Sequence, residues 1–118
     1  LWPGDVDEAA MYNAGYRYED LVRAVDVVVT KPGYGIISEC IANDTALLYT
    51  SRGDFREYPV LVEAMPRFLR CAYIEQDELL SRNWRPHLDR LLAQPKKRPP
   101  KTDGAPRAAE ILLRLVEP

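Results

Sequence analysis

The stretch VVVTKPGYGIISE, residues 27–39, decides which fold this chain is expected to adopt. It opens with a continuous β-branched run, which is typical of a strand buried in a parallel sheet. Pro32, Gly33 and Gly35 interrupt the run, and the sequence then continues as a helix that carries Glu39 near its start. The stretch therefore predicts a strand that turns through a glycine loop directly into a helix, beginning near Gly35 or Ile36.

The same alternation of element types extends along the chain on both sides of this stretch. The expected helices are at residues 16–25, 36–43 and 59–65, and the expected strands are at 27–29, 46–50 and 71–74. Asn43 or Asp44 suits the left-handed position that ends the second of these helices. Strands separated by single helices are typical of a parallel sheet with right-handed crossovers. We therefore predict an α/β fold in which the three strands are adjacent and parallel.

The composition divides the chain into a folded part, a linker and a final helix. These parts are expected at residues 1–94, 95–105 and 106–118. Residues 95–104 are expected to be exposed and poorly ordered, because proline and charge leave little to bury. The final helix is amphipathic and is expected to pack Ile111, Leu112 and Leu115 against the folded part. Three strands make a small sheet, and the chain begins with Leu1 rather than Met, so we interpret it as a fragment of a longer protein.

Composition excludes several classes of function. With 118 residues and a net charge of −2, the chain offers no basic surface for nucleic acid. No apolar run approaches the ~20 residues of a transmembrane helix, and residues 1–10 are not expected to be a signal peptide, because they lack a basic and an apolar region. Cys40 and Cys71 are interpreted as buried thiols of a cytoplasmic protein rather than as a disulfide or a catalytic thiol. His87 is the only histidine and has no ligand cluster around it in the sequence, so no metal site is expected.

The glycine loop has a chemical interpretation. Parallel sheets bind ligands at the carboxyl ends of their strands, and glycine lets a ligand approach the main chain closely. The free N–H groups at the start of the following helix attract anions, so the expected guest is a phosphate or a diphosphate. Glu39 follows about one turn later, and a carboxylate accepts hydrogen bonds from a ribose diol. Together these residues indicate a nucleotide site.

A purely structural explanation of the same residues stays open. Gly35 and Ser38 are also suited to starting a helix, and Glu39 complements the dipole of its first turns. The pattern Gly-Tyr-Gly-Ile-Ile-Ser is not the dinucleotide fingerprint, because the third glycine of that fingerprint is missing.

Residues 24–59, AVDVVVTKPGYGIISECIANDTALLYTSRGDFREYP, resemble the donor-binding domain of GT-B glycosyltransferases. The resemblance covers about residues 16–75. This part of the chain is similar to the peptidoglycan N-acetylglucosaminyltransferase family and to the glycosyltransferase-like region of plant L-arabinokinases. It implies the carboxyl-terminal half of a GT-B protein, a Rossmann-like three-layer fragment in which helices flank a small parallel sheet. The first part of the chain, residues 1–94, would then be a nucleotide-sugar-binding subdomain.

The resemblance also implies roles for individual residues. Gly33, Gly35 and Ser38 would contact the donor diphosphate, and Glu39 would hold the ribose. The polar loop after the second strand would contact the sugar through Arg52 and Glu57. Glu57 has an alternative interpretation as a solvated carboxylate at the start of a helix, and Lys31 suits either a phosphate contact or an ordinary surface position.

The resulting hypothesis is the donor-binding part of a glycosyltransferase, inactive on its own. Its substrate would be a nucleotide-diphosphate sugar, most simply UDP-linked, with no separate cofactor. The partner would be the amino-terminal half of the same protein, which would bring the acceptor site and any general base, so no catalytic residue is assigned. Two alternatives stay open: a non-catalytic nucleotide-sugar-binding or docking module, and a domain of a nucleotide-sugar epimerase.

Overall fold

The centre of the fold is a parallel sheet of three short strands. The computed structural model describes residues 7–116 of the chain. Its strands are β1 (Val27–Thr30), β2 (Ala46–Tyr49) and β3 (Cys71–Tyr73). They lie in the order β1-β2-β3, and both neighbouring pairs are parallel. The predicted adjacent, parallel arrangement of the three strands is therefore confirmed.

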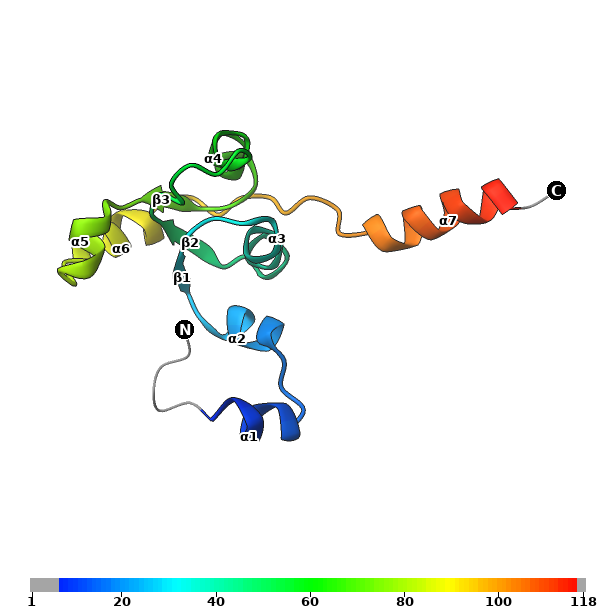
Figure 1. The fold of residues 1–118 in the computed structure, drawn as a ribbon, viewed down its shortest axis with the longest axis horizontal. Coiled ribbons are helices and arrows are strands. Elements are labelled where there is room, and N and C mark those ends of the chain that lie inside the picture. Colours follow the sequence, from blue (N-terminus) through cyan, green and yellow to red (C-terminus); the bar gives the residue numbers. More distant parts are fainter. Residues whose placement is uncertain (1–6, 117–118) are drawn as a thin grey trace.

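Helices cover both faces of this sheet (Figure 1). The helices are α1 (Glu8–Asn13), α2 (Tyr18–Ala24), α3 (Tyr34–Asn43), α4 (Tyr58–Phe68), α5 (Gln76–Leu80), α6 (Arg85–Leu92) and α7 (Gly104–Val116). One apolar cluster joins the sheet to α2, α3 and α4, and a second joins its other face to α5 and α6. The chain is thus a mixed α/β fold of three layers, consistent with a fragment of a Rossmann-like domain.

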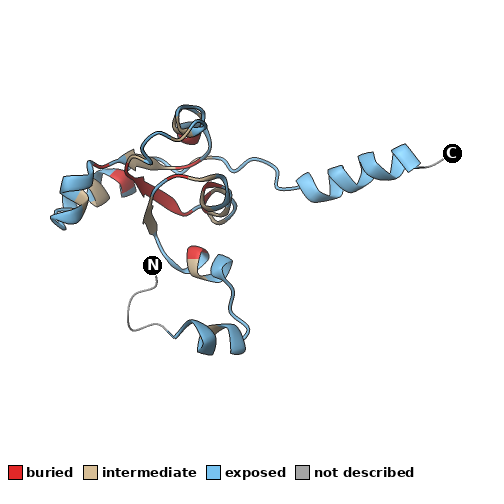
Figure 2. Ribbon diagram, in the orientation of Figure 1, coloured by how far each residue is buried: buried red, intermediate tan, exposed pale blue. Residues whose placement is uncertain are grey.

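β2 is the most buried element because it lies between the other two strands. Its alternate side chains enter opposite cores: Leu47 and Tyr49 belong to the cluster under α3 and α4, whereas Ala46 and Leu48 belong to the cluster under α6. Figure 2 shows this strand in the colour of buried residues. The continuous apolar composition of β2 follows from this burial on both faces.

β1 lies at an edge of the sheet, and its side chains are only partly buried. Val28 pairs with Leu47 of β2, and the backbone N–H of Thr50 donates to the carbonyl of Thr30 at 3.2 Å. These contacts align the carboxyl ends of β1 and β2, so the loops that follow the two strands emerge side by side.

α3 differs slightly from its predicted bounds. It begins at Tyr34, with Gly33 as its N-cap residue, and not at Gly35 or Ile36. It ends at Asn43, and its C-cap residue Asp44 adopts the left-handed conformation with φ of 54°, which was one of the two predicted alternatives. The earlier start moves Glu39 to the sixth position of the helix, farther from the helix N-terminus than the sequence suggested.

The carboxyl-terminal part of the chain leaves the folded body. Residues 95–103 form neither helix nor strand, and all of them are exposed except the half-buried Lys97, which confirms the predicted exposure of the linker. α7 then projects from the body (Figure 1), with Ile111, Leu112 and Leu115 exposed to 59%, 63% and 76%. The expectation that these residues pack on the domain is therefore wrong, because an amphipathic pattern specifies an apolar face but not the surface that covers it.

Removing the projecting segment should leave the folded body intact. The linker contacts the body near its start, where Lys96 Nζ lies 2.9 Å from Asp44 Oδ2. A chain truncated after Arg98 keeps this ion pair and loses only exposed residues of the described segment 99–116. We expect its free energy of unfolding in urea to differ from that of the full chain by less than about 0.5 kcal/mol. A loss of several kcal/mol on truncation would show that α7 supports the fold.

Candidate functional site

The carboxyl ends of β1 and β2 form the mouth where a parallel sheet binds ligands. The chain leaves β1 through Lys31, which is exposed, and Pro32, which is fully buried. It then enters α3 through Gly33, whose backbone is extended with φ of −155°. The buried proline fixes the path of the loop, so the start of α3 is held beside the end of β1.

The amino terminus of α3 presents main-chain donors to this mouth. The N–H of Ile37 donates to the carbonyl of Gly33 at 3.1 Å, and this is the first bond of the helix. The N–H groups of Tyr34, Gly35 and Ile36 precede that bond, and no side chain of the described residues caps them. Together with the helix dipole they make a positive end suited to an anion.

Arg52 lies directly against this glycine loop. Its Nη1 donates to the carbonyl of Pro32 at 2.9 Å, and its guanidinium carbon lies 4.2 Å from the centre of the Phe55 ring. A Cβ built on Gly33 would stand only 2.8 Å from Arg52 Nη1, so a side chain at residue 33 would push the guanidinium away from its present position. The structure thus brings a cation from the loop after β2 to the start of α3.

Gly35 has a different environment. A Cβ built at this position meets no heavy atom within 4 Å, and its φ lies outside the left-handed region. Neither packing nor backbone conformation therefore requires glycine here. What glycine does provide is close access from solvent to the first N–H groups of α3.

Glu39 is half-buried on the side of α3 that faces α2. Its carboxylate is close enough to act on two neighbours. Burial raises the pKa of the Cys40 thiol to about 12, with Glu39 adding to the shift. Burial first, and then Cys40 and Glu39, raise the pKa of Tyr18 on α2. The glutamate therefore lies in the second turn of α3, within electrostatic reach of Tyr18 and beyond the first N–H groups of the helix.

Ser38 and Glu57 have local roles in the helices that carry them. The Ser38 hydroxyl donates to the carbonyl of Tyr34 at 2.8 Å within α3. Glu57 is the N-cap residue of α4, where its carbonyl accepts from Leu61 N–H at 3.1 Å, and its exposed side chain makes no capping hydrogen bond. Of the predicted residues, Gly33 and Arg52 meet in a direct contact, and Gly35 shares the same helix start.

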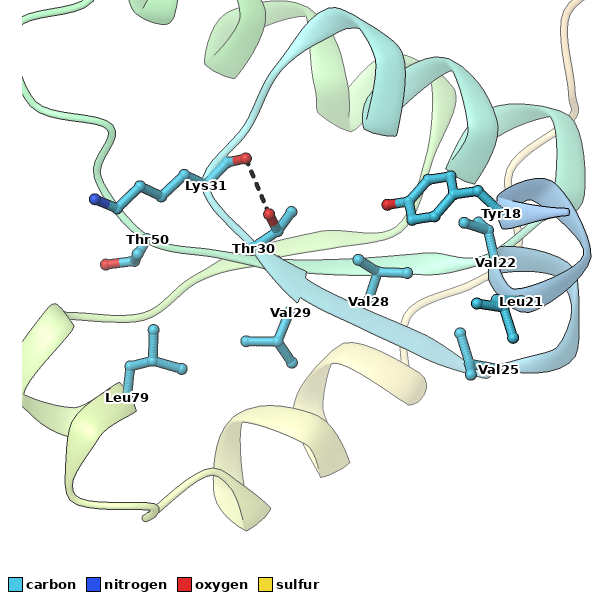
Figure 3. Close-up of a pocket in the computed structure, with 10 residues that line it drawn as sticks. All are labelled: Tyr18, Leu21, Val22, Val25, Val28, Val29, Thr30, Lys31, Thr50 and Leu79. Atoms are coloured by element: carbon cyan, nitrogen blue, oxygen red, sulfur yellow. Dashed lines mark hydrogen bonds between the residues drawn. The ribbon is translucent and has the colours of Figure 1, made fainter. Parts of the chain in front are cut away.

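A cavity of about 580 Å³ opens along the outer edge of β1 (Figure 3). Most of its wall is apolar and comes from α2, β1 and α5. The lining residues are Tyr18, Leu21, Val22, Val25, Val28, Val29, Thr30, Lys31, Thr50 and Leu79. Thr30, Lys31 and Thr50 form a polar part at the carboxyl ends of β1 and β2, and Tyr18 adds a phenol hydroxyl from α2.

Two residues of this region escaped sequence reasoning. Phe55 is a partly buried member of the core under α3 and α4, and it supports Arg52 from within a polar loop. The only signal for it was a single aromatic residue among charged neighbours. Thr50 is 3% exposed, and its hydroxyl has no hydrogen-bond partner in the described part of the chain. A threonine at a strand end carries no sequence signal for this property.

Other chemistries find little support among residues 7–116. This part of the chain holds no group of three or more His, Cys, Asp or Glu residues that could bind a metal ion. Cys40 and Cys71 are free thiols, and burial raises the pKa of both, so neither resembles an activated nucleophile. Within the same residues, no helix has the length and apolarity needed to cross a bilayer.

Comparison with known proteins adds no relative: no protein-family model, no curated protein and no solved structure matches this chain.

Proposed function

We propose that this chain is the donor-binding part of a glycosyltransferase that uses a nucleotide-diphosphate sugar. The observation that supports this proposal best is the arrangement around α3. An uncapped helix N-terminus lies at the carboxyl end of a parallel strand, with Arg52 on one side and the open position of Gly35 on the other. This combination suits a ligand with two linked phosphates and accounts for a glycine that packing does not require.

The chemistry of sugar transfer agrees with these groups. When the glycosyl bond breaks, negative charge develops on the departing diphosphate. The N–H groups of Tyr34, Gly35 and Ile36 and the Arg52 guanidinium would hold that charge without needing to reorganise. In this proposal the residues described here bind and stabilise the leaving group, and the remainder of the protein supplies the acceptor and any proton acceptor.

Glu39 completes the proposed donor site. A ligand whose diphosphate lies at the N-terminus of α3 would carry its ribose along the side of that helix toward α2. The half-buried Glu39 carboxylate, beside Tyr18, would accept hydrogen bonds from the ribose hydroxyls there. The moderate burial strengthens such bonds relative to those of a carboxylate exposed to water.

The test of the proposal is nucleotide binding measured by calorimetry. The parent chain should bind UDP or UDP-sugars, with GDP- and TDP-sugars as a comparison panel. Replacing Glu39 by Ala should weaken binding by about 1.5–3 kcal/mol, the scale of a hydrogen bond to a charged group, which is roughly 10- to 150-fold in Kd.

Glu63→Ala is a matched control for this substitution. Glu63 lies on α4, its side chain is 78% exposed, and its partner is Arg67. Its removal should leave nucleotide affinity unchanged. The proposal fails if the parent chain binds no nucleotide of the panel, and the role of Glu39 fails if both glutamate variants bind as tightly as the parent.

A further inference from the structure

Thr50 carries a polar group that nothing in the described chain uses. The residue is only 3% exposed and its Oγ1 has no hydrogen-bond partner among residues 7–116. Buried hydroxyls are nearly always paired, so an unpaired one calls for an explanation. The backbone N–H of Thr50 does have a partner, because it donates to the carbonyl of Thr30 at 3.2 Å. Only the side-chain hydroxyl therefore lacks one.

The second buried threonine, at the other end of β2, behaves differently. Thr45 is also 3% exposed, but its Oγ1 donates to the carbonyl of Val22 at 2.8 Å. The fold therefore does provide partners for a threonine hydroxyl at one end of β2. At the opposite, carboxyl end it does not, and this end is the one that faces the candidate site.

Thr50 is one of the residues that line the cavity beside β1. Thr50 and Lys31 both line it, and their side chains lie beyond the carboxyl end of β1 in Figure 3. The hydroxyl of Thr30, the third polar lining residue, already donates to the carbonyl of Lys31 at 3.2 Å. The available polar groups at this end of the cavity are therefore one buried hydroxyl and one ammonium, a donor set for an anion.

This donor set lies next to the start of α3. Lys31 precedes Gly33 by two residues, so their Cα atoms are at most about 7 Å apart. Arg52 lies on the same segment, through its bond to Pro32. Two anion-binding arrangements therefore adjoin one another, one at the N-terminus of α3 with Arg52 and one at Lys31 and Thr50.

We infer that Lys31 and Thr50 bind the second phosphate of the donor and so make the site select diphosphates over monophosphates. The N-terminus of α3 and Arg52 hold one phosphate, Lys31 Nζ pairs with the other, and Thr50 Oγ1 donates a hydrogen bond to it. This inference rests on the proposed nucleotide function and adds two ligand contacts to it.

The test compares UDP with UMP by calorimetry, because only UDP carries the second phosphate. We expect the parent chain to prefer UDP by tenfold or more, since the added contacts are charge-assisted. Thr50→Val keeps the shape of the side chain and removes the hydroxyl, and it should weaken UDP binding by about 5- to 10-fold without changing UMP affinity. Thr50→Ser should restore the preference, and Lys31→Met should lower it further.

Stability measurements separate this role from a structural one. Thr50→Val removes an unpaired buried hydroxyl, so its melting temperature should equal or exceed that of the parent. Thr45→Val removes a paired hydroxyl, so it should melt at a lower temperature and keep the full preference for UDP. If the parent binds neither nucleotide, both proposals fail. If the parent binds UDP and Thr50→Val retains the same preference, the inference alone is wrong.

Discussion

Replacing Gly35 by Val is expected to abolish nucleotide binding while the chain stays folded. A Cβ at this position meets no described protein atom within 4 Å, so we expect the free chain to accommodate the substitution. In the complex it would occupy the space through which a diphosphate reaches the N–H groups of α3. Losing two or more charge-assisted hydrogen bonds at about 1.5–3 kcal/mol each predicts a loss of at least roughly 100-fold in UDP affinity.

The Gly35→Val substitution should lower UDP affinity without lowering the free energy of unfolding. Glycine is the poorest helix former after proline, and Gly35 is the second residue of α3. The variant should therefore be as stable as the parent or more stable by a few tenths of a kcal/mol, measured by urea denaturation. Gly104→Val is the matched control, since Gly104 also starts a helix and also has no neighbour within 4 Å. Nearly parental UDP affinity in Gly35→Val would contradict the proposed site.

The sheet could be predicted because its signals are local. β1 and β2 are short apolar runs, the first partly buried and the second fully buried, and their bounds follow from residues that lie next to one another in the sequence. The end of α3 was predictable for the same reason. Apart from glycine, Asn and Asp are the residues that most readily adopt the left-handed conformation at the end of a helix. Its start was misplaced by one or two residues, since Gly33 is extended and Tyr34 already belongs to the helix.

The contacts that build the candidate site could not be predicted from local sequence signals. The two glycines look equivalent in the sequence, yet a side chain at residue 33 would displace Arg52, whereas a Cβ at residue 35 would meet no atom of the fold. Arg52 meets the loop from a position 20 residues away from its bonding partner Pro32, a separation that no local pattern encodes. The prediction that α7 packs on the domain was wrong for a related reason. The sequence shows that the helix has an apolar face but does not show which surface covers it.

Replacing Leu47 by Ala is expected to remove a large part of the stability of the chain. Leu47 is fully buried at the centre of the middle strand and belongs to the core under α3 and α4. Strands β1 and β3 flank it, so the surroundings have little freedom to collapse into the space that the truncation leaves. Substitutions of this kind cost about 2–5 kcal/mol, and a central strand should lie in the upper half of that range.

The matched control for this prediction is Leu80→Ala. Leu80 ends α5 and is 70% exposed, so the same chemical change there should cost less than about 0.5 kcal/mol. Urea denaturation of the two variants compares equal losses of side-chain volume at a buried and an exposed position. A loss of several kcal/mol at Leu47 alone supports a fold organised around β2, on which the positions of Thr50 and Arg52 depend. Equal and small losses in both variants would mean that β2 is not the centre of the fold, and the site built at its carboxyl end would lose its support.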